Sequence, residues 1–339
     1  HRSFREIVKI LDKKGSLIHI KKEVNSKFEM SAIMKKLEQE GKAFMFENIN
    51  GSHYKAVGGI FTSMDRYGLI FNEDASENFT YDQAGQKVQQ GISNPIPYIQ
   101  IDTGPITENI LINDDINLLD LPVPTFFELD TGPFITAAVG IFKKPGGEIN
   151  VGFYRCLIVD KKHILINASG LSDLRKSYNW HRENNKEMKV AMVLGAPPAL
   201  LMAAASKSPE HISELDVAGG MIGDGVRVVL GPKTGLPIPA DAEMVIETVV
   251  DLDNMVENTL GEFGAQYGTE TAPMCEVTSI LKRNDAMFYT LMAGRAKEHN
   301  NLGYLTVYGM SEMLKEKIKE VFSFVRSEER RVGKECRSR

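Results

Sequence analysis

The segment at residues 121–155 constrains the fold of this 339-residue chain most strongly, because proline turns divide its first half and strand-forming residues fill its second. After the Pro-Gly-Gly turn at 145–147, residues 149–159 are rich in β-branched and aromatic side chains. A second such run occupies residues 163–167, beyond a polar Asp-Lys-Lys turn. The pattern predicts a β-hairpin.

Two polar residues in this block, Asn150 and Arg155, are candidates for binding one ligand. A regular strand would send residues five apart to opposite faces, but Gly152 between them could form a bulge that aims both the same way. An Asn oxygen suits a hard cation, and an Arg guanidinium suits a phosphate or carboxylate. The alternative interpretation is two polar groups on a half-exposed strand.

Length and composition indicate an ordinary globular protein of two domains. Hydrophobic residues make up 42% of the chain and charged residues 25%, so a sizeable core can form. The formal net charge is −5, and no basic stripe is interleaved with aromatic residues. This argues against nucleic acid as the main partner.

The cysteines and the N-terminal segment bear on the cellular compartment. Cys156, Cys275 and Cys336 are widely spaced and form no CxxC pair, which favours a reducing cytoplasm. The first residues lack an apolar signal core, and no run of about 18 apolar residues occurs. We therefore expect neither secretion nor a membrane span.

The N-terminal part alternates between helix and strand patterns. Ser3 and Glu6 have capping-box spacing, which predicts a helix that ends near Gly15. The expected order continues with a strand, a helix and two strands, at residues 16–20, 26–40, 42–47 and 54–58. This order is typical of a small α/β lobe, which residues 72–94 would connect to the rest.

Helices and strands are also expected beyond the central block. The patterns predict a strand at 189–194, helices at 200–207, from 208 and at 310–324, and strands at 227–230 and 243–250 that return to one sheet. On the helix from 208, Glu210 and Glu214 would share a face, which without further information indicates solvated surface. Glu243 and Glu247 are expected to face outward or to brace the sheet.

Five motifs in one order resemble the UbiD-type decarboxylases, which use prenylated FMN. The similar segments are residues 121–155, 190–198 (VAMVLGAPP), 213–219 (SELDVAG), 239–247 (PADAEMVIE) and 261–264 (GEFG) with Gly268. The resemblance covers about residues 1 to 325. It implies an α/β (α+β) fold, in which a small N-terminal α/β lobe precedes a split β-barrel like that of flavin reductases.

The resemblance also implies a domain organisation. We expect the N-terminal lobe and connector at 1–114, the cofactor-binding barrel at 115–309 and the start of a C-terminal region at 310–326. Residues 327–339 have no apolar period and resemble a vector-derived tail. The further C-terminal lobe of the family is expected to be missing.

The family holds the flavin phosphate through a divalent metal bound by an Asn, a His and a Glu. Asn150 and Glu214 match the first and third ligands. No histidine lies in residues 171–180, where Asp173 takes the expected place and His181 follows just beyond. Asn, Asp and Glu oxygens suit Mg²⁺ or Mn²⁺. The alternative role for Asp173 is an N-cap of the following helix.

Catalysis in the family depends on an Arg, which Arg155 matches, and on two acids. Where many members read Glu-Gly-Pro-Phe-Gly-Glu, this chain has Leu260 and Ala265 at the acidic positions and Glu262 at the proline position. Glu262 is therefore the candidate for a displaced proton donor. The glycines at 261, 264 and 268 predict a loop that needs close approach or positive φ.

The resemblance implies a reversible, non-oxidative decarboxylase of aromatic, heteroaromatic or α,β-unsaturated carboxylic acids. It would use prenylated FMN, Mn²⁺ or Mg²⁺, and K⁺. A flavin prenyltransferase would supply the cofactor, and the full-length protein would form a homodimer or larger homo-oligomer. Two alternatives stay open: a non-catalytic flavin-binding or assembly subunit, favoured by Leu260 and Ala265, and an FMN-dependent reductase.

Overall fold

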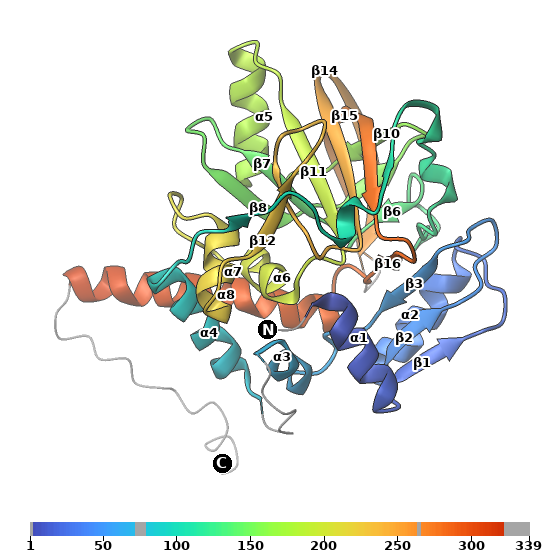
Figure 1. Ribbon diagram of the computed structural model, residues 1–339, viewed down its shortest axis with the longest axis horizontal. Coiled ribbons are helices and arrows are strands. Elements are labelled where there is room, and N and C mark those ends of the chain that lie inside the picture. The colour runs from blue at the N-terminus through green and yellow to red at the C-terminus, as the bar shows by residue number, and fades with distance from the viewer. Residues whose placement is uncertain (1–2, 72–78, 263–265, 322–339) are drawn as a thin grey trace, which may run out of the picture.

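The described residues form three β-sheets with helices packed around them (Figure 1). The structure, a computed structural model, describes residues 3–71, 79–262 and 266–321. The predicted tail at 327–339 therefore lies outside the described residues. In the described part, no helix is both long and apolar enough to span a membrane.

The N-terminal lobe is built on a four-stranded sheet in the order β1-β2-β3-β16. Its strands are β1 (Leu17–Ile20), β2 (Ala43–Phe46), β3 (Lys55–Gly58) and β16 (Met287–Tyr289). Its helices are α1 (Phe4–Lys13), α2 (Glu29–Gln39) and the short α3 (Asp65–Gly68). The predicted order is confirmed, including the reciprocal capping box of Ser3 and Glu6 at the start of α1. Because β16 pairs with β3, a late part of the chain completes this early sheet.

The central sheet has nine strands, in the order β6-β9-β10-β15-β14-β11-β7-β8 with β5 also on β15. The path of described strands does not close, as expected of a split barrel. The bounds are β5 (Asn109–Leu111), β6 (Phe134–Ile135), β7 (Val139–Lys143), β8 (Ile149–Phe153), β9 (Cys156–Ile158), β10 (His163–Ile166), β11 (Lys189–Leu194), β14 (Met244–Glu262) and β15 (Gln266–Lys282).

A third, small sheet has the order β13-β12-β4, with strands β4 (Ile99–Gln100), β12 (Arg227–Leu230) and β13 (Pro237–Pro239). The prediction that residues 227–230 return to the barrel was therefore wrong, whereas β14 does return to it. The domain limits at 114/115 and 309/310 stay predictions.

The remaining helices cover the sheets: α4 (Tyr81–Ser93), α5 (Asp173–Glu183), α6 (Pro198–Ala205), α7 (Glu214–Ile222) and α8 (Lys297–Val321). Two predicted starts were wrong. The helix expected from residue 208 begins only at Glu214, because Ser213 caps it, so Glu210 lies in the preceding turn. The helix expected from 310 begins at Lys297.

The strands β14 and β15 form one long hairpin rather than the predicted glycine-rich loop. Gly261 and Gly268 both lie within its paired strands, and Gly264 lies outside the described residues. Close approach is nevertheless what Gly261 provides, because a Cβ there would lie 2.4 Å from the ring of Phe127. The two strands, of 19 and 17 residues, are much longer than an ordinary strand of about 5–6 residues.

Two carboxylates, Glu243 and Glu247, are wholly buried and brace the barrel rather than facing outward. Glu243 accepts two hydrogen bonds from the guanidinium of Arg5 on α1, at 2.9 and 2.6 Å. Glu247 accepts from the backbone N–H of Thr234 at 2.9 Å and from the hydroxyl of Ser279. Burial without such partners would be costly, so both residues fix neighbouring segments to the sheet.

We expect Glu243→Gln to lower the free energy of unfolding by about 3–5 kcal/mol, because it leaves Arg5 without its buried partner. Asp285 provides a matched control, since it also pairs with Arg5 but its side chain is 80% exposed. Asp285→Asn should cost about 1 kcal/mol or less. Urea unfolding of both variants measures the difference, and equal losses would contradict the bracing role of Glu243.

Candidate functional site

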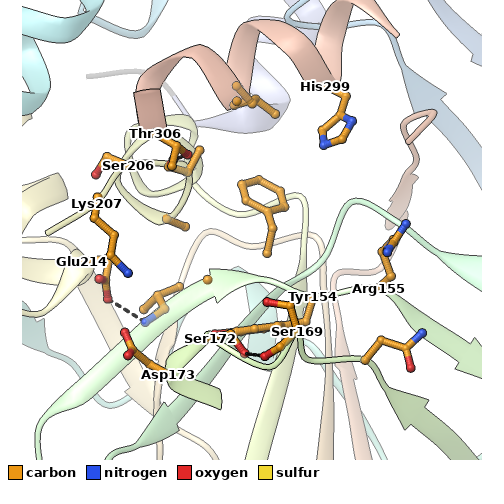
Figure 2. A pocket seen from close by; sticks show the side chains of 18 of the residues that line it. Tyr154, Arg155, Ser169, Ser172, Asp173, Ser206, Lys207, Glu214, His299 and Thr306 are labelled. Atoms are coloured by element: carbon orange, nitrogen blue, oxygen red, sulfur yellow. Dashed lines mark hydrogen bonds between the residues drawn. The ribbon is translucent and has the colours of Figure 1, made fainter. Parts of the chain in front are cut away.

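A cavity of about 480 Å³ lies between helix α8 and one end of the central sheet (Figure 2). His299 and Thr306 on α8 form one side, and Tyr154, Ser169, Ser172 and Asp173 lie across from them. The predicted site residues that line it are Asn150, Arg155, Asp173 and Glu214. The fold thus brings four of the five predicted site residues to one space.

Glu214 is the buried anchor of this cavity, with 7% of its surface exposed. Its Oε2 accepts a short hydrogen bond from the backbone N–H of Val151 on β8, at 2.7 Å. The amide Nδ2 of Asn150 donates only weakly, at 3.3 Å to Oε2 and 3.5 Å to Oε1. One carboxylate oxygen is therefore poorly compensated.

Two helix N-termini bring the acids together, and both use the same local pattern. Ser172 caps α5 by accepting from the N–H of Arg175, and Ser213 caps α7 by accepting from the N–H of Leu215. The first helical residues that follow these caps are Asp173 and Glu214. The N-cap role considered for Asp173 was therefore wrong, because Ser172 performs it. The positive ends of both helices favour negative charge here.

The electrostatics of this cluster suit a cation. Burial raises the pKa of Glu214 to about 7, against the opposing effect of the Val151 N–H, and the negative charge of Asp173 raises it further. A divalent cation would relieve this burial cost, and the amide of Asn150 can present its oxygen instead of its nitrogen. The residues Asn150, Asp173 and Glu214 therefore fit a Mg²⁺ or Mn²⁺ ion. Within the described residues, no group of three His, Cys, Asp or Glu side chains gathers for a metal.

Arg155 reaches the cavity for a different reason from the one predicted. Strand β8 pairs regularly with β7 through Gly152, opposite Gly140, so no bulge occurs there. Strand β8 ends at Phe153, and Arg155 lies in the two-residue segment outside any strand that precedes β9, where it lines the cavity. The two glycines instead make room for Tyr154, because a Cβ at Gly140 would lie 2.9 Å from its ring and one at Gly152 3.0 Å from its hydroxyl.

The sequence did not single out the part that Asp130 plays, although its Asp-Thr-Gly-Pro corner was a visible signal. Its carboxylate accepts from the N–H of Phe126, of Phe127 and of Gly261, the last at 2.6 Å. Burial raises the pKa of Asp130, and the backbone N–H groups and the charge of Arg155 oppose that rise. Asp130 therefore holds the end of β14 close to Arg155.

Of the two candidate proton donors, Glu262 and Glu270, only the side chain of Glu270 lies within the described residues. Glu262 ends β14 and pairs with Gln266, but its side chain lies outside the described residues, as does Ala265. Glu270 on β15 lines the cavity. Leu260 is buried, and the alternative ligand His181 is not among the residues that line the cavity.

His299 lines the cavity but could not be predicted from the sequence, because one histidine on a helix forms no pattern. Its Nδ1–H donates to the carbonyl of Gly294 at 2.7 Å. Since a carbonyl can only accept, this bond places the proton on Nδ1 and turns Nε2 toward the cavity (Figure 2). The ring thus offers a bound molecule an acceptor in its neutral form.

Comparison with known families matches this chain over most of its length. The profile of the 3-octaprenyl-4-hydroxybenzoate carboxy-lyase Rift-related domain matches residues 98–296, which is more than half of the chain. The profile of the N-terminal domain of the same carboxy-lyase matches residues 8–81. The chain belongs to the UbiD family.

Solved structures of the UbiD class share this fold. An evolved dimeric form of HmfF from Pelotomaculum thermopropionicum, in complex with prFMN, aligns with a TM-score of 0.84 and 25% identity over 94% of this chain and 73% of its own. The closed form of the vanillic acid decarboxylase of Sedimentibacter hydroxybenzoicus gives 0.87 and 25%, over 94% and 70%. An uncharacterised protein of Aquifex aeolicus is 27% identical over 96% of this chain and 71% of its own length. The predicted fold class is confirmed.

Proposed function

We propose that this protein is a reversible, non-oxidative decarboxylase of aromatic, heteroaromatic or α,β-unsaturated carboxylic acids that uses prenylated FMN and Mn²⁺ or Mg²⁺. The observation that carries the proposal is that one cavity contains both a cluster of side-chain oxygens and a guanidinium. The oxygens belong to Asn150, Asp173 and Glu214, and the negative charge of Glu214 is only partly balanced by hydrogen bonds. The guanidinium belongs to Arg155. Membership of the UbiD family and the likeness to HmfF and the vanillic acid decarboxylase support it.

The oxygen cluster would hold the cofactor through its phosphate. Asn150, Asp173 and Glu214 would bind the divalent cation, which in turn neutralises a phosphate that two carboxylates would otherwise repel. When bound, prenylated FMN supplies the electron sink that loss of CO₂ from an sp² carbon requires.

Arg155 and the tip of the long hairpin would act on the substrate side. The Arg155 guanidinium offers forked donors that suit a carboxylate, and Asp130 holds Gly261 beside it through a 2.6 Å bond. Because Glu262 directly follows Gly261, we assign to Glu262 the proton that replaces CO₂. Glu270 on the neighbouring strand is the alternative donor.

The metal assignment predicts that Glu214→Gln lowers Mn²⁺ affinity and flavin retention by about 10- to 100-fold, because it removes a charged ligand. Glu210→Gln is the matched control, since the Glu210 side chain is 85% exposed and lies only four residues away. Electron paramagnetic resonance of Mn²⁺ and flavin absorbance report the two quantities. Equal behaviour of both variants would place Glu214 outside the binding site.

The donor assignment predicts that Glu262→Gln, in protein loaded with cofactor, lowers exchange of the substrate carbon with deuterium by about 10². Glu270→Gln should lower it much less, and the flavin spectrum should be unchanged in both. If Glu270→Gln carries the larger loss, the assignment to Glu262 is wrong.

Co-expression with a flavin prenyltransferase, followed by mass and absorption of the bound cofactor, tests the function as a whole. Prenylated FMN with exchange on a panel of unsaturated acids supports the proposal. Cofactor without exchange would favour the non-catalytic subunit, and ordinary FMN with NAD(P)H oxidation would favour the reductase.

We also propose that the protein works in the cytoplasm and forms a homo-oligomer. Two buried free thiols, Cys156 and Cys275, support a reducing cytoplasm. The evolved dimeric form of HmfF supports a homodimer or larger homo-oligomer. The K⁺ ion implied by the resemblance stays a prediction.

A further inference from the structure

Two buried carboxylates outside the cavity meet where the N-terminal lobe contacts α8. Glu38 on α2 and Glu298 on α8 are 1% and 0% exposed. The backbone N–H of Glu298 points at Oε2 of Glu38, at 3.4 Å. The Glu298 carboxylate in turn accepts from the N–H groups of Gly59 and Phe61, at 2.7 and 3.0 Å, and from the hydroxyl of Tyr289, at 2.9 Å.

Helix α8 therefore contacts the N-terminal lobe with one face and lines the cavity with another. On one, Glu298 binds the backbone at 59–61, and Asn301 donates to the carbonyl of Phe61 at 2.8 Å. On the adjacent face, His299, Leu302 and Thr306 line the cavity. How α8 sits on the 59–61 segment consequently sets the position of one cavity wall (Figure 2).

The nearby cation does not neutralise both acids. The guanidinium of Arg66 donates to the carbonyls of Gly59 and Gly41, at 2.6 and 2.9 Å. Among the described ion pairs, none joins Arg66 to either carboxylate, and Oε1 of Glu38 has no hydrogen-bond partner within the described residues. The titratable groups that face the pair are Arg66 and Tyr67 on α3, Tyr81 near Tyr67 on α4, Tyr289 on β16 and Lys297 on α8.

We propose that Glu38 and Glu298 form a proton-dependent clasp, in which a proton on Glu38 removes the repulsion between the two carboxylates and so keeps α8 against the N-terminal lobe, and in which loss of that proton loosens the cavity wall. Two carboxylates this deeply buried beside one guanidinium cannot both ionise without strong repulsion. With Glu38 protonated, the pair carries one negative charge near the one positive charge of Arg66. The clasp thus links the N-terminal sheet to the shape of the cavity.

The direction of the pH dependence follows from burial. Burial raises the pKa of Glu38 to about 8, and the charge of Glu298 raises it further. Burial also raises the pKa of Glu298. A carboxyl with a raised pKa in the folded protein contributes stability that is present at low pH and lost as the pH rises through that pKa. The clasp is therefore closed at neutral pH and opens above about pH 8.

Amide hydrogen exchange of the whole protein tests the clasp. After correction for intrinsic rates, the protection of Gly59 and Phe61 and of residues 298–306 should fall about tenfold between pH 6 and pH 9, one unit above the pKa. Glu38→Gln removes one charge at constant shape and should abolish this fall. Glu40→Gln, an exposed residue at the end of the same helix, should behave as the unaltered protein.

Equal protection at both pH values in the unaltered protein would overturn the proposal, as would a fall that persists in Glu38→Gln. If Glu38→Gln does not fold, urea unfolding of the unaltered protein decides. A lower free energy of unfolding at pH 9 than at pH 6, together with loss of protection in these segments, supports the clasp, and an unchanged free energy overturns it.

Discussion

The buried carboxylate of Glu214 is the constraint around which the cavity is arranged. A negative charge in this position needs compensation, and the fold supplies it from the backbone N–H of Val151 on β8 and from the N-terminus of α7. This compensation is incomplete, because the contact of Oε1 with the Asn150 amide is long, at 3.5 Å, and burial raises the pKa of Glu214 to about 7. A cation bound here would relieve the remaining deficit, so the burial that destabilises the ionised acid also suits it to the ligand role that we propose.

The elements around Glu214 are held by equally specific polar contacts. Asp130 accepts a hydrogen bond from Gly261 near the end of β14, and Thr131 exchanges two hydrogen bonds with Thr259, at 2.9 and 2.8 Å. These two neighbouring residues therefore hold the last part of β14 near Arg155. On the opposite side, the N-terminal lobe holds α8 through Glu298. The cavity is thus bounded by parts of the chain that are far apart in sequence, and each is positioned by hydrogen bonds to the carboxylate of an acidic residue.

The sequence predicted those features of the structure that depend on neighbouring residues in the chain, and it failed where contacts between distant residues decide the structure. The capping box of Ser3 and Glu6 and the strand at Lys189–Leu194 were predicted because their signals are local. The bulge at Gly152 was wrong because a glycine in a strand gives no sign of what occupies its space, here the ring of Tyr154. The start of α7 was misplaced because Ser208 and Ser213 both look like caps, and only tertiary packing selects Ser213. For the site, the family resemblance pointed to Asn150, Arg155, Asp173 and Glu214, which line one cavity, although their roles stay predictions. The contacts of Asp130, Glu298 and His299 could not be predicted from the spacing of residues in the sequence.

The measurement that tests the central claim most directly is anomalous diffraction at the manganese edge, from crystals of the protein co-expressed with a flavin prenyltransferase in the presence of Mn²⁺. We expect one strong peak within ligand distance, about 2.0–2.6 Å, of oxygens from Asn150, Asp173 and Glu214, with a flavin phosphate on its open side. A flavin bound in the cavity with no metal at these three side chains, or a metal bound elsewhere, would contradict the account.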